Sequence, residues 1–209
     1  MKAIITGSSR GIGAAIAKEF SKRGHFYYGF SRWNDVDVSS YESIQEAFET
    51  MIPKDDVPEV LVNNAGIIKL GSILELDVED WLDQINVNLN GVFYCCKEYA
   101  RIAKKKGGKI INIASTAGMS ARPGRSCYSA TKAAVINFSM SIAEELKDYD
   151  IQVYCVCPGA VNTDLRKQVN PDDDFLDMLQ PSDVAKFVVD LAEGGKYLDN
   201  QSLILKKNM

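Results

Sequence analysis

Histidine is almost absent from this sequence: His25 is the only one among 209 residues. Of the five cysteines, none forms a CxxC pair with another. They are Cys95, Cys96, Cys127, Cys155 and Cys157. Zinc sites are built from clusters of Cys and His ligands, so we expect no metal site. We expect the cysteines, Cys127 included, to be reduced and buried, which is typical of a cytoplasmic protein. With His25 in a turn next to Gly24, catalysis by a Ser-His-Asp or Cys-His set is also not expected.

Strong charge and long apolar runs are missing as well. The net charge is -4 and the pI is about 5.1, so neither a nucleic acid nor an anionic membrane is an expected partner. No apolar stretch approaches the length of a membrane span. The opening MKAIITGSSRGIG reaches glycine too early for a secretion signal. With 46% hydrophobic residues, the chain is expected to form one cytoplasmic α/β domain over residues 1–209.

Strand-like and helix-like segments alternate along the chain. Short β-branched segments predict strands at 2–6, 26–31, 59–64, 109–115, 151–159 and 202–206. Helical spacing of apolar residues predicts helices at 13–24, 41–52, 78–106, 127–148 and 182–195, the last one capped by Ser182. This alternation predicts a doubly wound, Rossmann-like parallel sheet with helices on both faces.

One connection is too short for that pattern. Only RWNDV, residues 32–36, separates the second strand from Asp37 and Val38. A parallel crossover needs about a dozen residues or more, usually a helix. We therefore expect the crossover helix after the second strand to be missing, and a third strand to be absent or very short.

The segment TGSSRGIG lies between the first strand and the first helix, with glycines at 7, 11 and 13. Glycines allow the backbone to approach a pyrophosphate, which the free N–H groups of a helix start can bind. At the end of the second strand, where NAD-binding folds place a carboxylate for the ribose, this chain has Arg32. Together with Arg10 in the turn, Arg32 favours a 2'-phosphate and therefore NADP(H) over NAD(H).

Six motifs in order resemble the short-chain dehydrogenase/reductase family, and they cover nearly the whole chain. They are TGSSRGIG, NNAG at 63–66, NVNLNGVF around Asn88, INIAS ending at Ser115, YSATK at 128–132 and PGAVNT at 158–163. The SSRGIG turn is similar to the 3-oxoacyl-[acyl-carrier-protein] reductase branch. The resemblance implies a Rossmann-like oxidoreductase that interconverts a carbonyl and a secondary alcohol.

The resemblance also assigns catalytic roles to four residues. Tyr128 matches the acid/base, Lys132 the lysine that also holds the nicotinamide ribose, Ser115 the serine that binds the substrate oxygen, and Asn88 the asparagine of the proton relay. Tyr128 and Lys132 are spaced i, i+4, so both project from one helix face. A free tyrosine has a pKa of about 10, and a neighbouring cation favours its ionised form. We therefore expect Lys132, with the oxidised nicotinamide, to lower the pKa of Tyr128.

The expected cofactor-binding residues come from several segments. Asn63 is expected to tie neighbouring strands together instead of touching ligand. The cofactor-binding set is Gly7, Ser9, Arg10, Gly11, Ile12, Gly13, Ser31, Arg32, Asp37, Val38, Asn64, Ala65, Gly66, Tyr128, Lys132, Pro158, Gly159, Val161 and Thr163.

Departures from the family leave alternatives open. The segment 164–180, which matches the loop that covers the substrate, is shorter than in the family, and the C-terminal residues NQSLILKKNM lack its usual Asp-Gly-Gly. Trp33 is expected to partly cover the adenine. The partners expected are a small carbonyl or alcohol substrate and further copies of this chain, as a dimer or tetramer formed through the helices near Val78 and Tyr128. A 3-oxoacyl thioester, a small cyclic or pterin-like substrate, and a non-catalytic dinucleotide sensor all remain candidates.

Overall fold

A parallel six-stranded sheet forms the centre of the computed structural model, which describes residues 1–194 and 202–207. The strand order is β2-β1-β3-β4-β5-β6. The strands are β1 (Lys2–Thr6), β2 (Phe26–Phe30), β3 (Val60–Asn63), β4 (Gly108–Ile113), β5 (Ile151–Pro158) and β6 (Ser202–Leu205). The chain moves outward from β1 to β2 and then returns to the other side of β1 with β3. This reversal confirms the doubly wound prediction and creates a switch point between β1 and β3.

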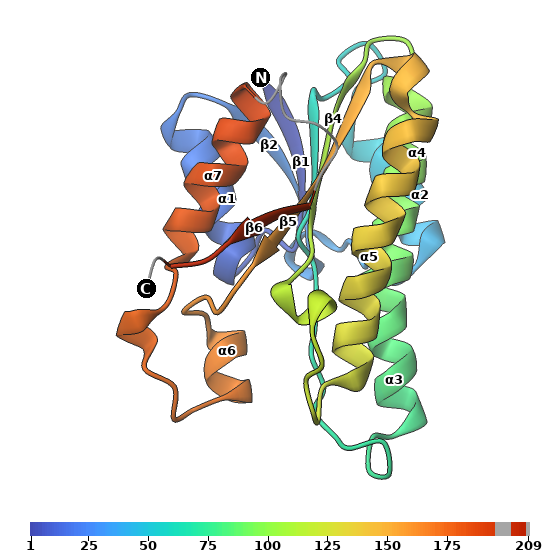
Figure 1. Ribbon diagram of the computed structural model, residues 1–209. Coiled ribbons are helices and arrows are strands. Elements are labelled where there is room, and N and C mark those ends of the chain that lie inside the picture. The colour runs from blue at the N-terminus through green and yellow to red at the C-terminus, as the bar shows by residue number, and fades with distance from the viewer. Residues whose placement is uncertain (195–201, 208–209) are drawn as a thin grey trace.

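Helices cover both faces of the sheet (Figure 1). They are α1 (Gly11–Lys22), α2 (Tyr41–Met51), α3 (Val78–Ile85), α4 (Gly91–Ala103), α5 (Ser126–Glu145), α6 (Asp164–Val169) and α7 (Pro181–Glu193). One apolar cluster joins one face of the sheet to α1 and α7, and a second joins the other face to α2, α4 and α5. The inner strands are buried on both sides, which explains their continuous β-branched sequences.

The sheet edge at β2 confirms the prediction from the short connection. Within residues 31–59 the structure has a 3-10 turn, Arg32–Asn34, and then α2, but no strand. Among the described strands, β2 therefore pairs with β1 alone. The helix α2 crosses from β2 directly to β3. Its N-cap is Ser40, whose hydroxyl accepts a hydrogen bond from the Ser43 amide.

Two expected features of the helices differ from the structure. The run 78–106 is not one regular helix, because α3 passes through a π-helical segment, Asn86–Asn90, before α4 begins. The cap of α7 is Gln180 instead of Ser182. Pro181 occupies the first turn, and Gln180 and Asp183 satisfy each other's backbone N–H groups in a capping box.

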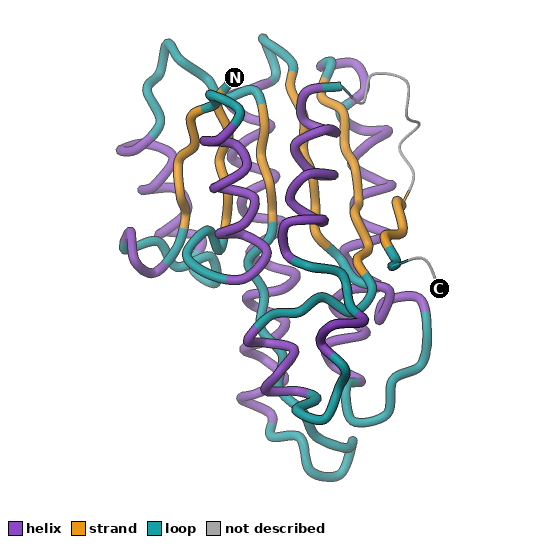
Figure 2. The backbone as a smooth tube through the Cα atoms, turned by 90° about the vertical axis from the view of Figure 1, so that its left-hand side faces the viewer, coloured by secondary structure: helices purple, strands orange, loops and turns teal. Residues whose placement is uncertain are grey.

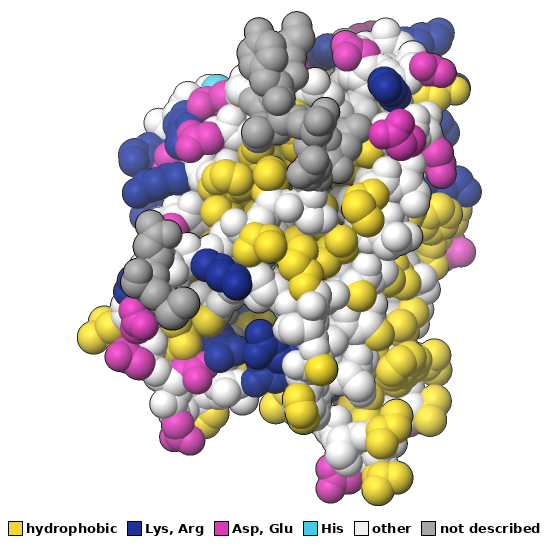
Figure 3. Space-filling view, in the orientation of Figure 1, with side chains coloured by type: hydrophobic (Ala, Val, Ile, Leu, Met, Phe, Trp, Pro, Cys, Tyr) yellow, Lys and Arg dark blue, Asp and Glu magenta, His cyan; other side chains and the backbone are white. Residues whose placement is uncertain are grey.

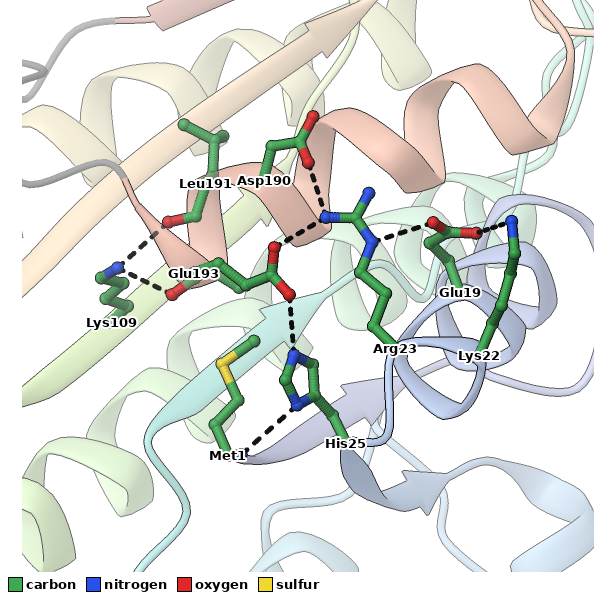
Figure 4. Close-up of polar contacts among 10 residues, drawn as sticks. Met1, Glu19, Lys22, Arg23, His25, Lys109, Asp190, Leu191 and Glu193 are labelled. Carbon is green, nitrogen blue, oxygen red and sulfur yellow. Dashed lines mark hydrogen bonds and ion pairs between the residues drawn. The ribbon is translucent and has the colours of Figure 1, made fainter.

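Polar contacts tie α1, α7 and β4 together at the end of the molecule away from the glycine-rich turn (Figure 4). Arg23 at the end of α1 forms ion pairs with Asp190 and Glu193 of α7. His25, the single histidine, bonds Glu193 at 2.9 Å. Lys109 donates to three carbonyls at the end of α7, where a cation suits the helix dipole. His25 therefore has a structural role, since it helps to hold α1 and α7 together.

The opposite end of the sheet carries the loops that follow the strands. The tube in Figure 2 shows chain segments extending well beyond this end of the sheet, and Figure 1 places α3 and α6 among them. In open α/β sheets, ligands bind outside the carboxyl ends of the strands. The fold therefore directs attention to this end.

Candidate active site

The turn after β1 is shaped for a close approach of another group. Gly7 and Gly11 have positive φ angles of 63° and 56°, which glycine adopts without strain. At Gly13 a Cβ atom would lie 2.2 Å from the Gly7 carbonyl oxygen and 2.4 Å from Asn64 Nδ2. Only glycine fits there, because the helix start and the turn touch each other directly.

The first turn of α1 is also electrostatically suited to a phosphate. Its N-cap, Arg10, makes no side-chain capping bond, and the first turn contains no acidic residue. The N–H groups at this helix end are thus not capped by a side chain, and the dipole end is positive. The residues present therefore fit the pyrophosphate of a dinucleotide.

Asn64 holds this turn against the segment that follows β3. Its Nδ2 donates to the carbonyls of Thr6 and Gly7, at 3.1 and 3.2 Å. In return the Thr6 hydroxyl accepts from the amides of Asn64 and Ala65, at 2.9 and 3.0 Å. These bonds join the two sides of the switch point. Thr6 was not among the expected site residues, although its place directly before Gly7 was a usable signal.

Asn63 acts inside the sheet, as expected. Its Nδ2 donates to Asn112 Oδ1 on β4 at 2.8 Å, and Asn112 donates in turn to the Ser139 hydroxyl of α5 at 2.9 Å. All three side chains are buried. This chain of amides connects β3, β4 and α5.

A cleft of about 940 Å³ opens at the carboxyl ends of the strands. It brings together segments that are distant from one another in the chain. The expected residues that line it are Gly7, Ser9, Arg10, Gly11, Ile12, Ser31, Arg32, Asp37, Val38, Asn64, Ala65, Gly66, Ser115, Tyr128, Lys132, Pro158, Gly159, Val161 and Thr163. Two expected residues, Gly13 and Asn88, do not line the cleft. Gly13 lies behind the turn, pressed against Gly7 and Asn64.

One end of the cleft contains Arg10, Arg32 and Trp33. The Arg32 side chain is 79% exposed, and its Nη2 is 3.7 Å from the carboxylate of Asp37. Burial acts to raise the pKa of Asp37, but hydrogen bonds from Ser39 and the charge of Arg32 outweigh it and lower that pKa. Asp37 is therefore ionised at neutral pH and pairs with Arg32. Trp33 is 82% exposed at the rim.

The middle of the cleft holds Ser115, Tyr128 and Lys132. Ser115 follows β4, and its Oγ accepts a hydrogen bond from the Ala117 amide at 3.1 Å. Tyr128 lies in the first turn of α5. Lys132 is only 4% exposed, and its Nζ donates to the Ile113 carbonyl at 2.9 Å and lies 5.8 Å from the centre of the Tyr128 ring. One helical turn therefore brings the phenol and the ammonium to the same wall of the cleft.

The pKa of Tyr128 differs from the sequence-based expectation. Burial raises this pKa, while hydrogen bonding to the Ser115 side chain and the charge of Arg125 oppose the rise. Lys132 is not among the groups that lower it. Burial lowers the pKa of Lys132 itself to about 8. The reason is desolvation, which disfavours both charged forms in the chain without cofactor. Tyr128 is accordingly a neutral phenol here, able to donate a proton.

Asn88 lies in the π-helical segment between α3 and α4 and is completely buried. Its Oδ1 accepts from the Ile67 amide at 2.8 Å, and its Nδ2 donates to the Ile67 carbonyl at 2.9 Å and to Thr131 Oγ1 at 3.2 Å. The side chain thus holds the segment that follows Gly66 against α5. It supports the wall of the cleft from behind.

The segment after β5 closes the cleft next to the first turn. Thr163 is the N-cap of α6, where its hydroxyl accepts from the Arg166 amide at 3.2 Å. A Cβ atom at Gly11 would lie 3.7 Å from Thr163 Cγ2, so this cap sits beside the glycine-rich turn. The segment 164–180, expected to be a short loop, contains α6 and a 3-10 turn, Phe175–Asp177.

Sequence reasoning placed the choice of substrate in residues 119–125 and in the segment 164–180, but it did not single out the basic group that these segments form at the other end of the cleft. The group consists of Arg122, Arg125 and Arg166, with Asn170 beside them. Arg125 immediately precedes α5, three residues before Tyr128, which was a signal for its position. Arg166 carried no such signal, because only the folded chain brings α6 opposite the start of α5.

The cysteines are all free and buried. Burial raises the pKa of Cys127, and it raises that of Cys96 to about 12. The expected burial of the cysteines is confirmed for all five. In residues 1–194 and 202–207 no three His, Cys, Asp or Glu side chains are grouped so that they could hold a metal ion. Among the same residues, none of the helices is both long and apolar enough to cross a membrane.

Comparison with known proteins adds relatives of known class. The family described as short chain dehydrogenase matches residues 31–174. A 3-oxoacyl-[acyl-carrier-protein] reductase of Chlamydia trachomatis is 30% identical over 238 residues, which cover 99% of this chain and 96% of that protein. The corresponding reductase of Synechocystis is 35% identical over 192 residues, covering 81% of this chain and 78% of the relative.

The fold has close counterparts among solved structures. A short-chain type dehydrogenase/reductase of Mycobacterium marinum superimposes with a TM-score of 0.91. The two chains are 24% identical, and the match covers 98% of this chain and 93% of the other. At that identity the likeness establishes the common fold.

Proposed function

The chain belongs to the short-chain dehydrogenase/reductase family, and from this premise we propose that it is an NADP(H)-dependent enzyme interconverting a carbonyl and a secondary alcohol. The observation that carries the proposal is that Ser115, Tyr128 and Lys132 share one cleft with the uncapped start of α1. Two independent requirements of the reaction, a dinucleotide cradle and a proton donor, are thus met in a single cavity.

The proton donor is Tyr128. When bound, the nicotinamide supplies or accepts the hydride. In the reductive direction Tyr128 gives its proton to the carbonyl oxygen as that oxygen gains charge, and Ser115 donates a hydrogen bond to the same oxygen. The raised pKa of Tyr128 keeps the proton in place until then.

Lys132 has a positioning and an electrostatic role. Its Nζ is fixed by the Ile113 carbonyl, which leaves further N–H donors for the nicotinamide ribose. As a cation it also stabilises the tyrosinate that remains after proton transfer. Asn88 supports these groups through Ile67 and Thr131.

The preference for NADP(H) is proposed from the two arginines at the adenosine end. Arg10 and Arg32 both line the cleft, and Arg32 stands where NAD-binding folds place a carboxylate. A 2'-phosphate would find two guanidinium groups there, and it would compete with Asp37 for Arg32. Trp33, at the same rim, is proposed to lie over the adenine.

The proposed substrates are 3-oxoacyl thioesters, as in the named activity of the reductases to which the chain is similar. A small cyclic or pterin-like carbonyl compound is the second candidate, because the lack of a strand between β2 and α2 and the short segment 164–180 leave the cleft more open. A dinucleotide sensor without turnover is the third. The complete Ser115, Tyr128 and Lys132 set argues against a sensor, which has no need of a proton donor.

A homo-oligomer in the cytoplasm is proposed from the surface and from the thiols. Exposed apolar side chains lie on α3, α4 and α5, among them Val78, Leu82, Phe93 and Met140. Such a surface on adjacent helices fits burial against a second copy, as a dimer or tetramer. The buried free cysteines fit a reducing compartment.

A substrate panel tests the function. The purified protein is mixed with NADPH or NADH and with 3-oxoacyl thioesters, cyclic ketones and pterins, and oxidation of the reduced nicotinamide is followed by absorbance. We expect turnover with NADPH for at least one carbonyl class. If NADPH binds tightly in a fluorescence titration but no carbonyl is reduced, the sensor reading replaces the enzyme.

A further inference from the structure

The end of the cleft next to Tyr128 contains more positive charge than the surrounding residues neutralise. Arg122, Arg125 and Arg166 all line it. Figure 3 shows basic side chains gathered in the lower half of the molecule, where α6 faces the segment leading into α5. The chain as a whole carries a net charge of -4, so this concentration is local.

The partners of these arginines are incomplete. Arg125 Nη2 donates to Asn170 Oδ1, which is a neutral amide. Arg166 forms an ion pair with Asp173, yet its Nε is shielded from solvent and has no hydrogen-bond partner. Within the described residues no ion pair involves Arg122 or Arg125. At most one carboxylate therefore directly neutralises the three guanidinium groups.

Such an arrangement is unfavourable by itself. Arg125 is half-buried, and its pKa is lowered by burial and then by the charges of Arg166 and Arg122. Asp173 and Tyr128 act in the opposite direction. Like charges held close together in a partly desolvated cleft repel each other, and a bound anion would relieve this repulsion.

We propose that Arg125 and Arg166 bind a carboxylate on the substrate, so that the enzyme reduces short oxo acids or oxidises the matching hydroxy acids. This inference rests on the proposed interconversion of a carbonyl and an alcohol, and it names free oxo acids, in place of thioesters, as the substrate class. Arginine suits the role because its planar fork can bind both carboxylate oxygens. Arg122, which is exposed at the mouth of the cleft, would attract the anion on entry.

The position of Arg125 limits the length of the substrate. It precedes Tyr128 by three residues, as the N-cap of α5, and the two side chains are close enough for the charge of each to act on the pKa of the other. A carboxylate held by Arg125 is therefore only a few bonds from a carbonyl that receives the Tyr128 proton. In that reduction the carbonyl carbon gains a hydride from NADPH, its oxygen gains the proton, and the nicotinamide is oxidised. Asn170, bonded to Arg125, keeps the guanidinium oriented toward the cleft.

The cofactor's own phosphates are the competing anion. Arg166 is on α6, whose cap Thr163 sits beside the glycine-rich turn. If Arg166 served the pyrophosphate, its loss would weaken NADPH binding. If it serves the substrate, its loss would weaken oxo acid binding and leave the dissociation constant of NADPH within a factor of about two.

The test compares oxo acids with their methyl esters, which keep the carbonyl and lose the charge. We expect wild-type kcat/KM to be higher for the acids. Arg125→Gln should lower the ratio of kcat/KM for acid over ester by about 10- to 100-fold, the effect of losing one charge-assisted hydrogen bond. Arg125→Lys should recover part of it. Lys167→Gln removes one charge from the exposed side of α6 and should leave the ratio unchanged.

A binding measurement makes the test independent of turnover. Calorimetric titration of a short hydroxy acid into the protein saturated with NADP+ should show binding that Arg125→Gln and Arg166→Gln abolish. The inference is overturned if acid and ester are reduced equally well and these variants leave the ratio unchanged, or if Arg166→Gln weakens NADPH binding instead. Turnover of neutral ketones alone would overturn the carboxylate site and leave the proposed function intact. Absence of turnover with every carbonyl would remove the proposed function itself.

Discussion

Replacing Lys132 with methionine should make the folded chain more stable near neutral pH. The side chain is 4% exposed, and burial lowers its pKa from 10.5 to about 8. Keeping the ammonium charged in the fold at neutral pH then costs about 3 kcal/mol, at 1.36 kcal/mol per pKa unit. Losing the hydrogen bond to the Ile113 carbonyl offsets about 1 kcal/mol. We expect Lys132→Met to stabilise the protein by about 2 kcal/mol.

The effect should depend on pH in a defined direction. A lysine with a lowered pKa binds fewer protons in the folded than in the unfolded chain between about pH 8 and 10.5. The contribution of Lys132 to stability therefore rises with pH through this window. The advantage of Lys132→Met should accordingly shrink from pH 8 upward. Ionisation of other groups, such as the buried thiols, changes the free energy of unfolding of both proteins. It therefore largely cancels when the two free energies are subtracted.

Urea unfolding of both proteins, followed by circular dichroism from pH 7 to 10, measures this difference. Lys105→Met, at an exposed position, serves as the control and should change stability by less than about 0.5 kcal/mol. If Lys132→Met were less stable than wild type at pH 7, with a difference independent of pH, burial of the charged ammonium would not destabilise the fold by the amount derived above.

Two further substitutions test the cofactor cradle. Arg32→Asp should raise the Kd of NADPH at least tenfold with little change for NADH, because it replaces a charge-assisted bond to a phosphate by repulsion; equal Kd values for NADPH before and after would refute the assignment of Arg32. Gly13→Ala should lower the melting temperature and abolish dinucleotide binding, because its Cβ would lie 2.2 Å from a backbone oxygen and overpacking of this kind costs about 1–3 kcal/mol; an unchanged melting temperature would show that the turn can move.

The architecture was largely predictable from the sequence because its signals are local. Strands buried on both faces have continuous β-branched sequences, and the helices between them have regular apolar spacing. The shortness of the RWNDV link was enough to predict that no further strand lies beyond β2 at the edge of the sheet. The glycine-rich turn was predictable for the same reason, since its backbone conformation requires Gly7 and Gly11 and its close packing requires Gly13.

What escaped prediction depends on contacts between distant segments. The spacing of apolar residues around Asn86–Asn90 is that of a regular helix, so the sequence does not reveal the π-helical turn there. The turn is accompanied by hydrogen bonds between Asn88 and Ile67, which lies 21 residues earlier in the chain. The sequence predicted a lowered pKa for Tyr128, but in the chain without cofactor burial raises it. The i, i+4 spacing of Tyr128 and Lys132 does not reveal that the phenol is buried. The basic group around Arg166 forms only when α6 folds back onto the start of α5.

The most direct measurement of the central claim pairs turnover with cofactor affinity in Tyr128→Phe. Tyr149→Phe, in the exposed 3-10 turn after α5, makes the same chemical change away from the cleft and serves as the control. We expect Tyr128→Phe to lose at least a hundredfold in kcat, the contribution of a general acid, while its Kd for NADPH stays close to that of wild type. Turnover in Tyr128→Phe equal to that of Tyr149→Phe would show that the phenol in the cleft does not move the proton.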